Sequence, residues 1–257
     1  MKFYIGEMVV KVKAVPEHPV LKSFFRRPVD GYAEANFRWD IEVVTKQDWH
    51  YEAWDCEDGV WFTGRRGHYF EYDGSKNKFT LKVMRELDKE NLYWLRRDLF
   101  GGFGSVSCQQ VIHSSAVIKD GQGYVFSAPS ETGKTTLFNN LCDYAEQVND
   151  ESNWVYQNEE GRFMLVNQNY YLGSSNIHEV PLAGLYLLEQ AADCEVIDTV
   201  DAMEAFTILL SIHPPFNYFD PFLEDRSAAI RHLQKNFTVK KFLVNLKPEE
   251  IAETLFG

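Results

Sequence analysis

A short segment rich in small and hydroxyl residues, Ala128–Thr136, constrains the fold of this 257-residue chain more than any other feature. It reads Ala-Pro-Ser-Glu-Thr-Gly-Lys-Thr-Thr and follows an apolar run over 124–127 that has the composition of a buried strand. Residues that favour a helix follow from Lys134 to about Tyr144. A strand, a loop that ends in Gly-Lys-Thr and a helix form the pattern of a phosphate-binding loop. The sequence therefore predicts an α/β domain with a phosphate site at the end of this strand.

Each residue type in the segment suits a triphosphate. Gly133 lacks a Cβ, so its backbone can turn tightly and bring N–H groups close to phosphate oxygens. Lys134 supplies a mobile cation for the β- and γ-phosphates, and the Thr135 hydroxyl can ligate Mg²⁺. The N-terminus of the following helix points its positive end at the same phosphates. The predicted nucleotide-binding residues are Ser130, Glu131, Thr132, Gly133, Lys134, Thr135 and Thr136. The alternative is an ordinary strand, turn and helix with a chance Gly-Lys-Thr.

An acidic pair, Asp150-Glu151, follows Lys134 by 16 residues. That separation suits one short helix and one short strand, so the pair can lie at the same edge of a parallel sheet as the loop. Phosphoryl transfer needs carboxylates that hold Mg²⁺ and a base for the nucleophile. We therefore predict Asp150 as a catalytic residue, and Thr135, Asp150 and Glu151 as metal ligands. Without the loop beside it, such a pair is more often a solvated surface feature.

Charge divides the chain into two parts. Residues 1–100 carry 17 basic and 17 acidic residues, whereas the remainder carries 9 and 21, so the whole net charge of −12 lies after residue 100. Short aromatic and β-branched runs over 1–86 predict strands, and residues 90–100 have helical spacing. Turn formers over 98–105 predict a boundary. We expect a β-rich domain with a linking helix over 1–104 and an α/β domain over 105–257.

Composition excludes several protein classes. No run approaches the roughly 18–20 apolar residues of a membrane span, and the first residues lack the pattern of a signal peptide. Four scattered cysteines predict neither a disulfide framework nor a zinc site. The negative charge argues against nucleic acid as a partner. These features predict a cytoplasmic protein without a membrane partner, and they leave open whether it forms a homo-oligomer.

With these motifs in order, the segment 110–153 resembles the HPr kinase/phosphorylase family, especially its smaller relatives in peptide-modifying gene clusters, such as lasso-peptide kinases. The matched features are His113-Ser114-Ser115 on a strand, a hairpin, the phosphate loop and the acidic pair. The stretch 173–190 is also similar to that group. The resemblance implies a phosphoenolpyruvate-carboxykinase-like P-loop kinase domain, ATP and Mg²⁺ as cofactors, and a serine hydroxyl of a peptide or small protein as acceptor.

The resemblance also implies roles for single residues. His113 would lie near the γ-phosphate and complete a catalytic set with Lys134 and Asp150, where Asp150 accepts the proton of the acceptor hydroxyl. From the residues alone, a histidine on a strand is as well explained by packing in the core. Arg226 and Arg231 are further candidates for stabilising the transferred phosphate, and a surface ion pair is the alternative for each.

Some positions depart from the family pattern. Ala128 stands where glycine is usual, Glu131-Thr132 replaces smaller residues, and Glu151 stands where a second aspartate is usual. No signature for phosphorolysis is present, so the reverse activity is not predicted. Two alternatives to a peptide kinase stay open: a kinase for a small-molecule hydroxyl, and a nucleotide-binding interaction module in which Glu131 and Glu151 mark a decayed site.

Overall fold

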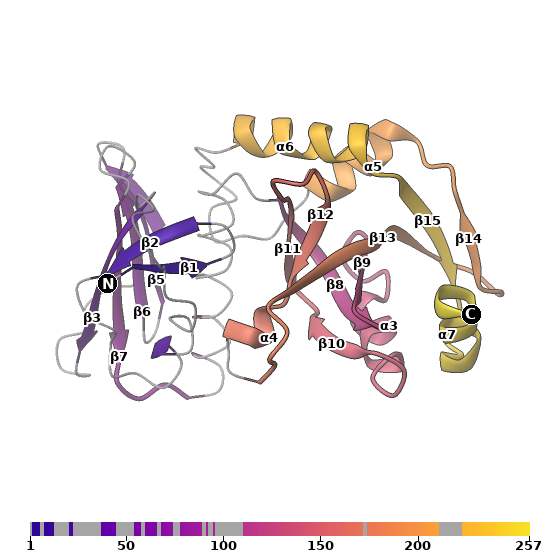
Figure 1. The fold of residues 1–257 in the computed structure, drawn as a ribbon, viewed down its shortest axis with the longest axis horizontal. Coiled ribbons are helices and arrows are strands. Elements are labelled where there is room, and N and C mark those ends of the chain that lie inside the picture. Colours follow the sequence, from indigo (N-terminus) through magenta and orange to yellow (C-terminus); the bar gives the residue numbers. More distant parts are fainter. Residues whose placement is uncertain are drawn as a thin grey trace. The chain divides into compact units, whose positions relative to one another are not determined.

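A computed structural model provides the structure of the chain, which divides into two compact units (Figure 1). One unit comprises Met1–Phe100 with Tyr170–Ser174, and the other comprises Gly101–Asn169 with Ser175–Gly257. The structure describes residues 2–5, 8–12, 21–22, 37–44, 54–57, 60–65, 68–73, 78–88, 91, 95, 110–171, 174–210 and 223–257. The predicted domain boundary at residues 104 and 105 lies outside this described part.

The N-terminal unit is built on one seven-stranded sheet, as its β-branched and aromatic runs predict. Its strands are β1 (Lys2–Ile5), β2 (Met8–Val12), β3 (Phe37–Val44), β4 (Trp54–Glu57), β5 (Val60–Arg65), β6 (His68–Asp73) and β7 (Lys78–Met84). Strands β4 to β7 are antiparallel neighbours in sequence order, whereas β3 pairs with β2 and β7 in parallel. Of the predicted linking helix, Asn91 and Leu95 are described, and both are helical.

From Gln110 onward, strands and helices alternate in a mixed α/β arrangement. The elements are β8 (Gln110–Lys119), β9 (Gln122–Ser127), α3 (Lys134–Asn140), β10 (Glu146–Asn149), β11 (Ser152–Gln157), β12 (Phe163–Val166), α4 (Gln168–Tyr171), β13 (Glu179–Gln190), β14 (Glu195–Ile197), α5 (Ala202–Leu210), α6 (Leu223–Asn236), β15 (Val239–Val244) and α7 (Pro248–Phe256). The predicted hairpin turns at Asp120-Gly121, both at positive φ. Helix α3 is shorter than predicted, and it ends at Asn140.

Two long strands, β8 and β13, organise the eight-stranded sheet of this unit. The first half of β8 pairs with β11, and its second half pairs with β9 and β10. In the same way β13 pairs first with β12 and then with β9 and β15. The pairings therefore close a ring of five strands, β8–β11–β12–β13–β9, from which β10, β15 and β14 extend the sheet.

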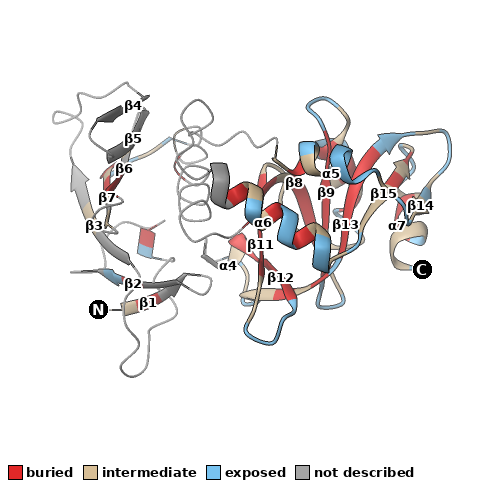
Figure 2. Ribbon diagram, turned by 90° about the horizontal axis from the view of Figure 1, so that it is seen from above, coloured by how far each residue is buried: buried red, intermediate tan, exposed pale blue. Residues whose placement is uncertain are grey.

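Helices cover both faces of this sheet, so apolar side chains fill two layers. On one face Leu137 of α3 and Ile251 of α7 pack against Phe126 and Phe242. On the other face Leu209 of α5 and Leu233 of α6 pack into a cluster with residues of β8, β9, β11, β12 and β13. Figure 2 shows the buried residues concentrated on these central strands and on the inner side of α6. Strands buried on both faces have nearly continuous apolar runs, which explains the composition of β9 and β13.

The direction of β10 corrects one expectation about the acidic pair. Strand β10 does not join β9 in a parallel sheet; it pairs antiparallel to β8, which itself pairs antiparallel to β9. Two antiparallel steps give β9 and β10 the same direction, with β8 between them. Both strands therefore still end at the same edge, and the phosphate loop and Asp150 both follow that edge.

Gly184 lies where any side chain would collide with an aromatic layer. A Cβ at this position would lie 2.2 Å from Cε2 of Tyr186. The Tyr186 ring stacks on Phe126 at a centroid distance of 5.5 Å and meets Phe242 edge-on at 6.1 Å, so it has little room to move. We expect Gly184→Ala to lower the free energy of unfolding by about 1–3 kcal/mol, measured by chemical denaturation.

Gly121→Ala is the matched control for this substitution. Gly121 has a φ of 75°, and a Cβ there would meet no other atom within 4 Å, so alanine costs only backbone strain, about 1 kcal/mol. If Gly184→Ala lowers the free energy of unfolding by no more than Gly121→Ala does, the collision with Tyr186 is contradicted.

Candidate functional site

The phosphate loop follows β9 directly and ends at the first residue of α3. Gly133 precedes the helix with a φ of 102°, a left-handed conformation that favours glycine. Glu131 also has a left-handed backbone, with a φ of 66°, although it carries a side chain. These two reversals turn the main chain tightly between Ser127 and Lys134. The glycine that the sequence motif requires therefore stands at a position where the fold needs it.

The Lys134 side chain lies within its own loop. Its Nζ donates hydrogen bonds to the carbonyl oxygens of Ala128, at 2.9 Å, and Pro129, at 3.0 Å. The residue is 6% exposed, and this burial lowers the pKa of its ammonium, while the negative charge of Glu151 acts in the opposite direction. The ammonium is thus held in place by two backbone acceptors, and among the described residues its third N–H has no acceptor.

Two polar side chains brace the loop. The Thr132 hydroxyl donates to the Pro129 carbonyl at 2.9 Å, within the loop itself. From the end of β13, Gln190 Nε2 donates to the Thr132 carbonyl at 3.2 Å. Ser130, Glu131, Thr135 and Thr136 are exposed. The loop is therefore fixed from inside and from β13, while the exposed residues face solvent.

The acidic pair occupies a bend between β10 and β11, and both of these strands pair with β8. Asn149 lies opposite Ala116 and Ser152 lies opposite His113, so the register leaves Asp150 opposite Ser115 and Glu151 opposite Ser114. The Ser114 N–H donates to the Glu151 carbonyl at 3.2 Å. Strands β10 and β11 therefore pair with successive parts of β8, and the bend lies between them at a defined position along β8.

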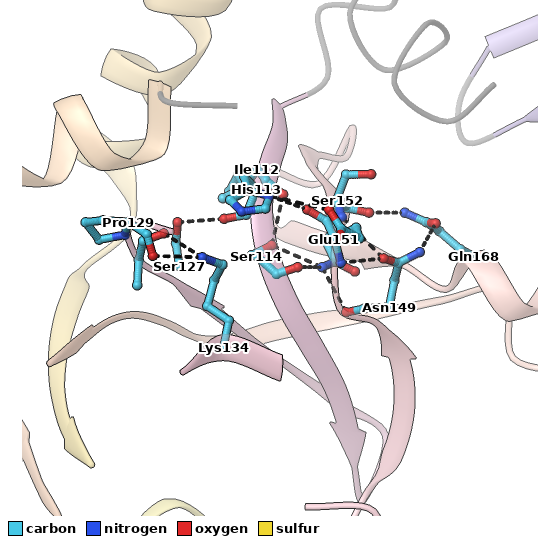
Figure 3. Close-up of polar contacts among 12 residues, drawn as sticks. Ile112, His113, Ser114, Ser127, Pro129, Lys134, Asn149, Glu151, Ser152 and Gln168 are labelled. Carbon is cyan, nitrogen blue, oxygen red and sulfur yellow. Dashed lines mark hydrogen bonds and ion pairs between the residues drawn. The ribbon is translucent and has the colours of Figure 1, made fainter. Parts of the chain in front are cut away.

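His113 is tied to the same bend. Its Nδ1 lies 2.8 Å from the Glu151 carbonyl oxygen and 4.0 Å from Oε2 of the Glu151 side chain. Because a carbonyl can only accept, the short contact requires a proton on Nδ1. The Ser127 hydroxyl donates to the His113 carbonyl at 2.9 Å. His113 therefore connects the strand before the phosphate loop to the acidic bend, as Figure 3 shows.

Electrostatic coupling joins the loop and the bend. Burial is the main cause that raises the pKa of the Asp150 carboxyl, and the neighbouring charge of Glu151 raises it further. The same Glu151 charge acts on the Lys134 ammonium. Strand β8 separates the two segments, because Ser127 and Glu151 flank Ser114 from opposite sides. Two strand spacings put these flanking backbones roughly 10 Å apart.

The oxygens near the loop suit a hard cation. Within the described ranges no group of three or more His, Cys, Asp and Glu side chains is placed to hold a metal by itself. The predicted ligands Thr135, Asp150 and Glu151 offer only oxygen atoms. Mg²⁺ prefers such ligands and commonly takes one or two from protein, with phosphate and water completing its shell. The residues therefore fit a magnesium ion that arrives with a nucleotide, and they do not fit a zinc site.

The remaining candidates have other contacts. Arg226 is buried, and its Nη2 donates to the Leu210 carbonyl at 3.1 Å. Arg231 is exposed, and its guanidinium lies over the Phe206 ring at 5.4 Å. These contacts attach both arginines to the α5–α6 layer rather than to the phosphate loop.

Sequence reasoning missed the polar side chains that support the bend. Asn149, Asn153 and Gln168 hydrogen-bond to its backbone, and no local motif marks them. Nearby, the Ser115 hydroxyl and the Asn153 amide oxygen are buried without a hydrogen-bond partner among the described residues. Each buried polar atom of this kind calls for an explanation, such as strain, a catalytic role, or a bound water molecule or ion.

Comparisons with known proteins do not assign this chain to a family. No family model matches the sequence, and no curated protein matches it. Among solved structures, the Hpr(Ser) kinase/phosphatase from Coxiella burnetii aligns with a TM-score of 0.31 and 9% identity, over 57% of this chain and 88% of that chain. A likeness this loose carries no argument. No helix in the described ranges is long and apolar enough to cross a membrane.

Proposed function

We propose that this protein is a Mg-ATP-dependent kinase that transfers the γ-phosphate to a serine-type hydroxyl of a peptide or small protein. One observation carries the proposal: Ser127, the last residue before the phosphate loop, and Glu151 of the acidic bend flank Ser114 of β8 from opposite sides. Phosphoryl transfer requires a phosphate cradle and carboxylates at one site, and here a single strand lies between the two segments. The motif resemblance to HPr kinases supports a serine-type acceptor.

The roles follow from the chemistry of each group. Loop N–H groups around Gly133 and the Lys134 ammonium bind the β- and γ-phosphates and neutralise charge that develops during transfer. Thr135, Asp150 and Glu151 would hold Mg²⁺, which would supply further charge neutralisation when bound. The acceptor oxygen forms a bond to the γ-phosphorus as the bond to the β-phosphate oxygen breaks. The hydroxyl proton passes to Asp150, and ADP leaves.

The raised pKa of Asp150 suits the role of a base. A carboxyl group with its ordinary pKa is a weak base near neutral pH, and burial makes Asp150 a stronger one. His113 is held through Nδ1 by the Glu151 carbonyl, so its ring orientation is fixed. We assign it a place next to the γ-phosphate, and the Glu151 side chain would be a ligand of the metal.

The direct test is transfer of labelled phosphate. The protein is incubated with Mg²⁺ and γ-labelled ATP, with serine-containing peptides in one arm and small hydroxyl metabolites in the other. We expect ADP release that depends on the peptide and a phosphate-sized mass gain on its serine. Transfer only to the metabolites would favour a small-molecule kinase. Nucleotide binding without ADP release in either arm would favour a non-catalytic module.

Glu131 gives a separate prediction about nucleotide affinity. Its exposed carboxylate stands in the loop that would surround the phosphates, and its backbone is left-handed. Glu131→Gln removes only the charge, whereas Glu131→Gly also removes the strain of the side chain at positive φ. We expect both variants to bind ATP more tightly, by about threefold to tenfold in Kd for a loss of roughly 1 kcal/mol of repulsion.

Calorimetric titration and thermal unfolding separate the two effects. Glu131→Gly should also unfold at higher temperature than Glu131→Gln, since only glycine adopts the left-handed backbone without cost. Weaker ATP binding by both variants would show instead that the carboxylate contributes to binding, for example through the metal.

A further inference from the structure

Asn149, the last residue of β10, folds its side chain over the acidic bend. Its Oδ1 accepts from the backbone N–H groups of Glu151, at 2.7 Å, and Ser152, at 3.2 Å. An asparagine that bonds backbone N–H groups two and three residues ahead stabilises a turn in one conformation. Asp150 and Glu151 therefore lie on a bend whose backbone is fixed by the side chain that precedes it.

Gln168, the first residue of α4, joins the two ends of this bend. Its Oε1 accepts from Asn149 Nδ2 at 2.7 Å, and its Nε2 donates to the Ser152 carbonyl. Gln168 is 1% exposed, so the oxygen and the nitrogen of its side-chain amide both depend on these partners for hydrogen bonds. From β11, Asn153 Nδ2 donates to the Asn149 carbonyl at 3.3 Å. Figure 3 shows Asn149 and Gln168 on the side of the bend away from Lys134.

The residues on either side of Gln168 bind the rest of β10. Asn167 Nδ2 donates to Oε1 of Glu146 at 3.1 Å, and Asn169 Nδ2 donates to the Gln147 carbonyl at 2.6 Å. Three consecutive amide side chains, residues 167–169, thus attach the start of α4 to β10. These hydrogen bonds run to β10 and its bend rather than to the phosphate loop.

We propose that Asn149 and Gln168 are positioning residues that fix the acidic bend in the geometry that phosphoryl transfer requires. The inference rests on the proposed function, because it assigns the two amides to the same reaction. Their effect is confined to the carboxylate side of the site, since the phosphate loop is braced separately by Thr132 and Gln190. Loss of either amide should therefore slow the chemical step and leave nucleotide binding nearly unchanged.

Asn149→Ala, Gln168→Ala and the double variant test this, with Asn158→Ala as a matched control. Asn158 accepts from the backbone N–H groups of Glu160, at 3.1 Å, and Arg162, at 2.9 Å, so it stabilises a turn in the same way at the other end of β11. We expect kcat to fall about 10- to 100-fold in both single variants, since misplacement by ~1 Å can cost that much. The KM for ATP should stay within about threefold, as expected when only the transition state is affected.

The double variant should be no slower than the slower single variant, because both substitutions release the same bend. Asn158→Ala should lose a similar free energy of unfolding and keep its kcat. A kcat for Asn149→Ala and Gln168→Ala as high as that of Asn158→Ala would overturn the proposal, and so would a parallel loss of ATP binding.

Amide hydrogen exchange provides a readout that does not depend on activity. Protection of the Glu151 and Ser152 N–H groups should fall in Asn149→Ala and in Gln168→Ala, and it should stay at the wild-type level in Asn158→Ala. Unchanged protection in the two bend variants would overturn the role of the amides even if kcat fell. Absence of phosphate transfer in the wild-type protein would instead refute the proposed function, and the exchange experiment would still decide whether these amides fix the bend.

Discussion

Replacing Lys134 with alanine is expected to lower phosphate transfer by at least about 10²- to 10³-fold, the loss that follows removal of one preorganised charge-stabilising group. The ammonium is held within the loop by two backbone carbonyls, 2.9 and 3.0 Å away, so its position is fixed before a nucleotide binds. Nucleotide binding should weaken as well, because in the proposed function the same cation would contact the phosphates in the ground state. The measurements are kcat/KM from ADP release and the Kd for ATP from calorimetry.

Lys119→Ala is the matched control for Lys134→Ala. Lys119 ends β8 on the opposite edge of the sheet and pairs loosely with the exposed Asp120, at 3.8 Å. Its loss removes one positive charge without touching the loop, so kcat/KM should change by less than about twofold. Equal activity of the two variants would refute the role of Lys134.

Asp150→Asn is expected to separate catalysis from stability. Turnover should fall about 10²- to 10⁴-fold, because the amide cannot accept the hydroxyl proton, while ATP should still bind. The variant should nevertheless be more stable than the wild type. Burial raises the pKa of Asp150 in the folded protein, so the ionised carboxylate destabilises the fold at a pH above that pKa. Below the pKa that Asp150 has in the unfolded chain, this destabilisation is absent.

The stability gain of Asp150→Asn should therefore depend on pH. Near pH 8 the variant should unfold at a higher temperature than the wild type, and the difference should vanish as the pH falls through the pKa of Asp150. Asp143→Asn, at an exposed aspartate in the turn after α3, should leave both turnover and stability nearly unchanged. Full turnover in Asp150→Asn would exclude this residue as the base, and a lower stability near pH 8 would contradict a cost from the partial burial of its carboxylate.

Much of the C-terminal fold is predictable because its signals are local. Asp120-Gly121 marks the hairpin, Gly133 marks the start of α3, and Pro248 opens α7, each through its own backbone preference. By contrast, β12 and β14 are only four and three residues long and carry no periodicity that a sequence alone reveals. Strand β12 exists because β11 and β13 pair with it, and β14 exists because β15, a strand far along the chain, pairs with it.

In the candidate site, too, some residues are marked by local motifs, whereas others are brought together only by the fold. The phosphate loop and the acidic pair are contiguous motifs, so the sequence identifies them, but their relation through β8 depends on strand pairing over tens of residues. The contact between His113 and Glu151 spans 38 positions, and that between Asn149 and Gln168 spans 19. Asparagine and glutamine have no local pattern that marks such partners, so only the folded chain identifies the residues that support the bend.

The central claim is that the backbone around Gly133 and the Lys134 ammonium bind the phosphates of a nucleoside triphosphate. The most direct measurement is a titration of the labelled protein with a non-hydrolysable ATP analogue and Mg²⁺, followed by the amide resonances of the main chain. We expect saturable shifts at Gly133, Lys134 and Thr135, none at the Asp120-Gly121 turn, and loss of the shifts in Lys134→Ala. A titration that leaves Gly133 and Lys134 unshifted at saturating analogue would contradict the central claim.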